Sequence, residues 1–145
     1  MNKEKALEML MEFLTKYGDS IHFHSLFIQE LRQIILNEAK GTEKHFFNAL
    51  VKQFTFIADP AIQIDAIGKN EKLSHVPPHF KKPIYSIHIH TKVLNVRLLV
   101  IINDYGKAIF TTCFSEKSGK KKTDYSTHIS VAIDRYNRIM EGDNE

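Results

Sequence analysis

The first half of the chain carries apolar residues at the spacing of amphipathic helices. A first helix is predicted over residues 3–17, and Gly18 can supply the left-handed stop. Its apolar positions recur every three or four residues: Leu7, Leu10, Met11 and Leu14. Two further amphipathic segments meet at Gly41-Thr42, where Thr42 is placed as the N-cap of the later helix, so they predict a helical hairpin.

The boundaries of this hairpin are set by two short patterns. Residues 21–24 alternate with period two, which fits either a short strand or the start of the helix. Asp59-Pro60 ends the later helix, because proline disfavours a helical conformation in the residue before it. Residues 59–78 are expected to be mostly loop.

The second half of the chain carries strand patterns. Three segments either alternate between apolar and polar positions or are rich in β-branched residues: 84–91, 93–103 and 108–115. They predict an antiparallel meander. A final helix is then expected, capped by Thr123 or Asp124. The predicted fold is a single α+β domain over residues 1–145, with an additional N-terminal helix in residues 1–20. It has a helical hairpin, a small antiparallel sheet of three to four strands with helices on one face, and a C-terminal helix.

Composition and charge narrow the class of protein. The 145 residues are 43% hydrophobic and hold one cysteine, Cys113, which excludes a disulfide framework and a thiolate zinc cluster and is interpreted as a core thiol. No apolar run approaches the roughly 20 residues that span a bilayer, and no secretory signal is recognised, so a cytoplasmic protein without membrane contact is expected. The net charge of +3 is uneven, since residues 81–122 hold nine basic and two acidic residues. This segment predicts a surface for an anionic partner.

Two features of that segment suggest contact with nucleic acid. Arg97 interrupts an apolar strand, so its guanidinium either points to solvent or lines a groove. Lys81 and Lys82 precede the strands and could converge with Arg97 at one edge. A polar loop carries four further lysines, which can either contact phosphates or simply solubilise the loop. They are Lys117, Lys120, Lys121 and Lys122.

Histidines and a tyrosine are the candidates for proton transfer. Tyr125 and His128 lie one turn apart on the final helix, where they could cleave RNA or simply cap and pack the helix. In a cleavage reaction a base removes the 2′-hydroxyl proton, cations hold the phosphate, and an acid protonates the leaving oxygen. The pairs His22/His24 and His88/His90 each share one strand face. They could be surface residues, an acid or base, or together a four-imidazole metal site.

The ordered pattern from Tyr85 to Ile139 resembles the C-terminal half of the RelE/ParE toxin superfamily, and within it the branch of HigB and phage-related proteins. The resemblance is carried by five short stretches: residues 84–89, 96–101, 111–118, 124–126 and 129–135. It extends over residues 43–140 if the Phe-rich helix is part of the family's hairpin.

This resemblance implies a RelE-like sheet with a helical pair on one face and a C-terminal helix. It also implies ribosome-dependent cleavage of mRNA without a metal or cofactor, and neutralisation by a cognate antitoxin. Arg97 would contact the scissile phosphate, Lys117 would be the basic residue after the phenylalanine, Tyr125 and His128 would supply acid and base groups, and Lys81 and Lys82 would hold the RNA. The residue patterns themselves add His88 as an acid or base and the loop lysines as phosphate contacts. The predicted catalytic residues are Arg97, Lys117, Tyr125, His128 and His88, and the predicted RNA-binding residues are Lys81, Lys82, Lys120, Lys121 and Lys122.

Two positions depart from the family pattern, since His88 stands where an arginine is expected and Glu116 replaces the first lysine of a pair. Both departures remove a cation from the implied site. The alternative is therefore a non-catalytic protein of the same fold, either a gyrase-type inhibitor or an inactive phage-related protein.

Overall fold

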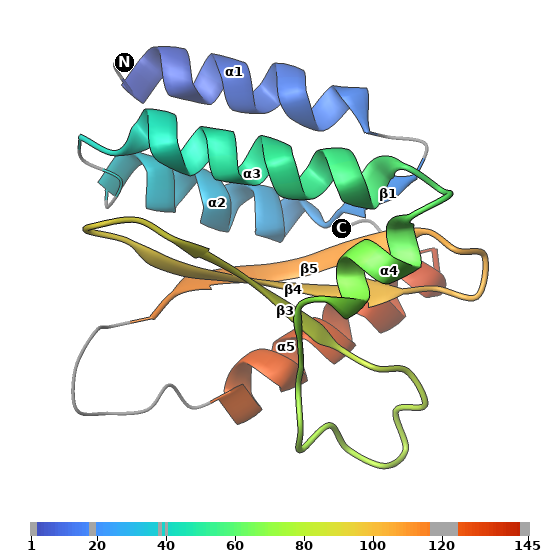
Figure 1. The fold of residues 1–145 in the computed structure, drawn as a ribbon. Helices are drawn as coiled ribbons and strands as arrows, with labels where there is room; N and C mark the ends of the chain where they lie inside the picture. The colour runs from blue at the N-terminus through green and yellow to red at the C-terminus, as the bar shows by residue number, and fades with distance from the viewer. Residues whose placement is uncertain (1–2, 18–19, 38, 40, 117–124, 143–145) are drawn as a thin grey trace.

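The computed structural model describes residues 3–17, 20–37, 39, 41–116 and 125–142. Among these residues the helices and strands follow one another along the chain as shown in Figure 1. Their bounds are α1 Lys3–Lys16, β1 Ile21–Phe23, α2 Ser25–Asn37, α3 Glu43–Ala58, α4 Gln63–Gly68, β2 Glu71–Lys72, β3 Tyr85–His90, β4 Asn95–Ile102, β5 Ala108–Ser115 and α5 Tyr125–Met140.

The helices are layered on both faces of the sheet. Figure 1 shows α2 and α3 side by side on one face, with α1 stacked over them, and α5 on the opposite face. The mixed α+β class and the hairpin are confirmed, but the prediction that helices cover only one face is wrong. The reason is visible in β4, where Val96 and Leu98 join the core beneath α2 and α3, while Leu99 and Ile101 join the core beneath α5. None of the described helices combines the length and apolar character needed to cross a bilayer.

Within the described residues the sheet has five strands in the order β1-β5-β4-β3-β2, rather than three or four. The meander of β3, β4 and β5 is antiparallel as predicted. The prediction of a wholly antiparallel sheet is wrong, because β1 pairs in parallel with β5 through Ile21↔Ala108 and Phe23↔Phe110. The intervening helices and strands provide the long crossover that a parallel pair requires.

Two short elements lie in the segment expected to be mostly loop. The helix α4 is tied to the end of α3, because the Gln63 side chain donates a hydrogen bond of 2.8 Å to the carbonyl of Ile57, and it buries Ile67. The strand β2 pairs with Tyr85 and Ser86 at the edge of the sheet. The Gln63 side chain also reaches the Ser20 carbonyl, and β2 depends on its pairing with β3, so contacts between elements hold both and the local sequence gives little signal for them.

A cluster of phenylalanines fixes α2 and α3 on the sheet. The ring of Phe110 on β5 lies 4.9 Å from that of Phe54 on α3, 5.5 Å from that of Phe23 and 5.6 Å from that of Phe27 on α2. Aromatic pairs at these separations add to the stability gained from burial. Cys113 is buried in the same core, as its interpretation as a core thiol required.

Candidate functional site

Four of the predicted site residues gather on the face of the sheet that carries α5. His88, Arg97 and Phe114 lie opposite one another on β3, β4 and β5. From the first turns of α5, the His128 ring stacks on Phe114 with centroids 3.6 Å apart, and the Tyr125 ring meets Phe114 edge-on at 5.8 Å. Sheet register and helix position together thus bring two imidazoles, a phenol and a guanidinium to one surface.

Arg97 is held by two carboxylates. Its Nε donates to Glu116, and its Nη1 donates to Glu71 at 3.2 Å. Glu116 is fixed by its own backbone N–H, which donates to the Asn95 carbonyl at 2.7 Å, and Glu71 is brought in by β2. Only 17% of the Arg97 side chain is exposed, compared with 53% of the Glu71 side chain. A phosphate that bound Arg97 would therefore compete first with Glu71, the more exposed carboxylate.

The phenol of Tyr125 keeps its proton at neutral pH. Burial raises its pKa to about 12, and the carboxylates of Glu116 and Glu71 add to the rise, while the positive charge of Arg97 opposes it. A phenol in this state can donate a proton or a hydrogen bond but cannot act as a base near pH 7. Any base in this cluster must then be an imidazole or a carboxylate.

The two histidine pairs lie on different strands and do not meet. The strand β1, with His22, is separated from β3 by β5 and β4, so the alternative in which the two pairs form one four-imidazole metal site is ruled out. His24, which follows β1, is buried and accepts a hydrogen bond of 3.0 Å from the Leu26 N–H. The described residues contain no group of three or more histidine, cysteine or acidic side chains that could hold a metal ion. His88 is exposed and contacts the Asn95 side chain, so it is accessible to a ligand.

The described basic residues do not form one continuous surface. Lys82 pairs with Asp104, which follows the far end of β4, whereas Arg97 lies near the start of that strand. Lys81 is exposed beside Lys82, so the two lysines do not converge with Arg97. The predicted residues Lys117, Lys120, Lys121 and Lys122 lie outside the described residues, as do the predicted caps Thr123 and Asp124.

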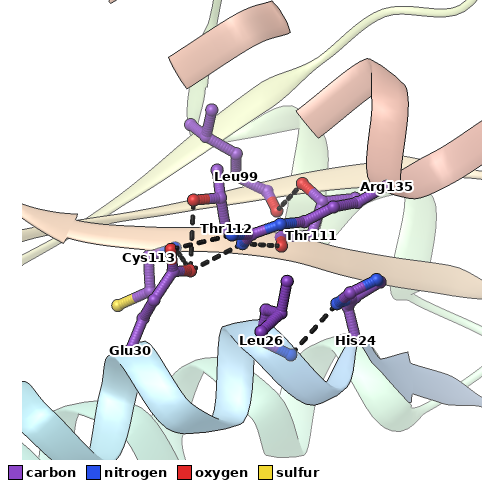
Figure 2. A network of polar contacts seen from close by, with 8 residues as sticks. All are labelled: His24, Leu26, Glu30, Leu99, Thr111, Thr112, Cys113 and Arg135. Atoms are coloured by element: carbon purple, nitrogen blue, oxygen red, sulfur yellow. Dashed lines mark hydrogen bonds and ion pairs between the residues drawn. The ribbon is translucent and has the colours of Figure 1, made fainter. Parts of the chain in front are cut away.

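A polar network that the sequence did not predict joins the two faces of the sheet. Arg135 on α5 forms a bidentate ion pair with Glu30 on α2, at 2.8 and 3.1 Å, beside the part of β5 that β1 does not reach (Figure 2). Arg135 also donates to the Thr111 carbonyl at 2.9 Å, and Glu30 accepts from the Cys113 N–H at 3.1 Å. The one hint in the sequence is a pair of charged residues within otherwise amphipathic helices, 105 positions apart.

No protein-family model, curated protein or solved structure matches the chain. The side chains of Arg97, His88, Tyr125 and His128 define the chemistry that this face of the sheet can perform. A guanidinium can bind an anion, an imidazole can exchange a proton, and the half-buried phenol can donate one. Such a set suits acid–base chemistry on a phosphate ester.

Proposed function

We propose that the protein is an endoribonuclease of the RelE/ParE toxin type, which cleaves mRNA on the ribosome and is neutralised by a cognate antitoxin. The observation that carries the proposal is that one face of the sheet places His88 beside Arg97 in register, and Arg97 beside Phe114, on which Tyr125 and His128 pack. The α+β class, with a helical hairpin before the antiparallel meander and a helix after it, supports the proposal at the level of fold class.

In the proposed reaction side chains, rather than a metal ion, bind the phosphate and transfer the protons. Arg97 binds the scissile phosphate and stabilises the charge that develops on it. The imidazole of His88 accepts the 2′-hydroxyl proton while the 2′-oxygen attacks phosphorus. The bond from phosphorus to the 5′-oxygen breaks, and Tyr125 protonates that oxygen. The products are a 2′,3′-cyclic phosphate and a free 5′-hydroxyl.

The test is expression from a tightly regulated promoter in bacterial cells. Induction of the wild-type chain is expected to stop growth and to produce cut mRNA, mapped by primer extension. Arg97→Ala is expected to restore growth, whereas the control Arg138→Ala, an arginine exposed on α5, remains toxic. Normal growth with intact mRNA on induction of the wild-type chain contradicts the proposal.

A second candidate function is binding without cleavage, and the two carboxylates on Arg97 favour it, because they neutralise the cation meant for the phosphate. The protein would then block a partner such as gyrase through the same surface. Purified protein would inhibit supercoiling or bind RNA, and His88→Ala, Tyr125→Phe and His128→Ala would leave the binding unchanged.

A further inference from the structure

A pocket of about 250 Å³ opens beside Arg97, on the side of Glu71. Its apolar floor is made by the buried side chains of Leu73 and Ile129, and the ring of Tyr125 forms part of its wall. Ser74 and His75 line it as well, both with exposed side chains. An apolar floor, an aromatic wall and a few polar groups are typical of sites that hold a flat heterocycle.

One residue that lines the pocket also has an unusual backbone conformation. His75 has a φ of +64°, a left-handed conformation that residues other than glycine adopt at a cost. The pocket is smaller than the roughly 300–1,000 Å³ of sites for drug-sized ligands. Its volume therefore fits a single ring system rather than a whole nucleotide.

Glu71 belongs both to this pocket and to the Arg97 ion pair. One of its carboxylate oxygens lies 3.2 Å from Nη1 of Arg97, and the same side chain lines the pocket. It comes from a strand of two residues at the sheet edge, and half of it is exposed, so it can turn from the guanidinium toward a ligand. Such a turn would also release Arg97 for a phosphate.

We propose that the pocket binds the base of a nucleotide whose phosphate lies on Arg97, and that Glu71 selects guanine. The proposal rests on the proposed ribonuclease function and names its substrate preference. A carboxylate only accepts hydrogen bonds, and guanine alone presents two adjacent N–H donors on its Watson–Crick edge. Adenine, cytosine and uracil present an acceptor beside their donor, which a carboxylate repels.

The experiment compares the binding of GMP and AMP to the purified full-length protein by calorimetry. The wild-type chain is expected to bind GMP about tenfold more tightly than AMP, the discrimination that one good pair of hydrogen bonds provides. Glu71→Gln is expected to bring that ratio close to one. Asp65→Asn, which removes the same charge from an exposed position on α4, is expected to leave the ratio unchanged. Ser74→Trp, which fills the pocket, is expected to weaken both nucleotides.

Two results would overturn the inference. The first is equal affinity of the wild-type chain for GMP and AMP. The second is an equal increase in the affinity for both nucleotides in Glu71→Gln. The second result would mean that Glu71 only repels phosphate. The same comparison with all-deoxy oligonucleotides, which lack the attacking 2′-hydroxyl, separates binding from cleavage. A guanine preference lost in Glu71→Gln, in a protein that never cuts RNA, would sustain the pocket and refute the ribonuclease. Cleavage with a base preference that Glu71→Gln leaves unchanged would support the ribonuclease and refute the role of Glu71 in the pocket.

Discussion

At the scale of single residues, Tyr125 links the site to the stability of the protein at high pH. Its pKa rises to about 12 in the folded chain, chiefly through burial, whereas an unfolded tyrosine has a pKa of about 10. Between these values the unfolded chain loses the proton and the folded chain keeps it. The free energy of unfolding is therefore expected to fall as the pH rises from about 10 to 12.

Tyr125→Phe is expected to make that fall shallower, as measured by urea denaturation at several pH values between 9 and 12. Part of the fall remains in the variant, because burial also raises the pKa of Tyr136. Tyr105→Phe is the matched control, since the Tyr105 side chain is 92% exposed. If Tyr125→Phe and Tyr105→Phe behaved alike, the phenol of Tyr125 would not be held in its protonated form.

The sequence identified Arg97 because a cation within an apolar strand either points to solvent or lines a groove. It did not identify Glu71, which lies in a segment with no strand signal and reaches Arg97 only because β2 pairs with β3. The neighbouring Glu116 was noticed as a departure from a family pattern, but its contact with Arg97 depends on where β5 ends. Charged partners distant in sequence follow from the sheet register, which local patterns do not determine.

At the scale of elements, the pair of Glu30 and Arg135 clamps α2 and α5 across the edge of the sheet. Arg135→Ala removes both guanidinium contacts of the partly buried Glu30 carboxylate, which keeps its bonds from Thr112 and Cys113, and it removes the Arg135 donor from the Thr111 carbonyl. The expected loss in the free energy of unfolding is about 2–3 kcal/mol, below the value for a fully buried pair because Glu30 is partly exposed. Chemical denaturation measures this loss.

Arg138→Ala is the control for that prediction, because Arg138 forms an exposed pair with Asp134 on the same helix. It is expected to change the free energy by less than about 0.5 kcal/mol. Losses of similar size in Arg135→Ala and Arg138→Ala would show that the clamp adds nothing beyond a surface ion pair. The double variant Glu30→Ala/Arg135→Ala is expected to lose less free energy of unfolding than the sum of the losses in the two single variants, because the partners are in contact.

The long elements were predictable, whereas of the short ones only β1 was anticipated, as one of the two alternatives for residues 21–24. The helices α1, α3 and α5 and the strands of the meander carry many periodic positions, so their patterns predicted them to within a few residues. By contrast, β1 has three residues and β2 has two, and each exists because a neighbouring strand pairs with it. The prediction of helices on one face failed because β4 is apolar on both sides, so both of its faces are covered.

At the scale of the whole molecule, the structure changes the interpretation of the positive charge. The segment 81–122 is strongly basic in sequence, yet in the described part of it Arg97 and Lys82 are paired with acids and lie toward opposite ends of β4. Lys92 is exposed after β3, and Lys107 immediately precedes β5. A strand of RNA seated at Arg97 would therefore contact only some of these cations.

The salt dependence of binding tests this arrangement. For a single-stranded oligonucleotide that cannot be cleaved, each phosphate contact contributes about −0.7 to the slope of log K against log salt concentration. Arg97→Ala is expected to make the slope shallower by about 0.7, and Lys82→Ala is expected to leave it unchanged, because Lys82 lies at the other end of the strand and pairs with Asp104. Fluorescence anisotropy at several salt concentrations gives the slopes. Equal changes in both variants would mean that the nucleic acid runs along the whole strand, and no change in either would place it on another face.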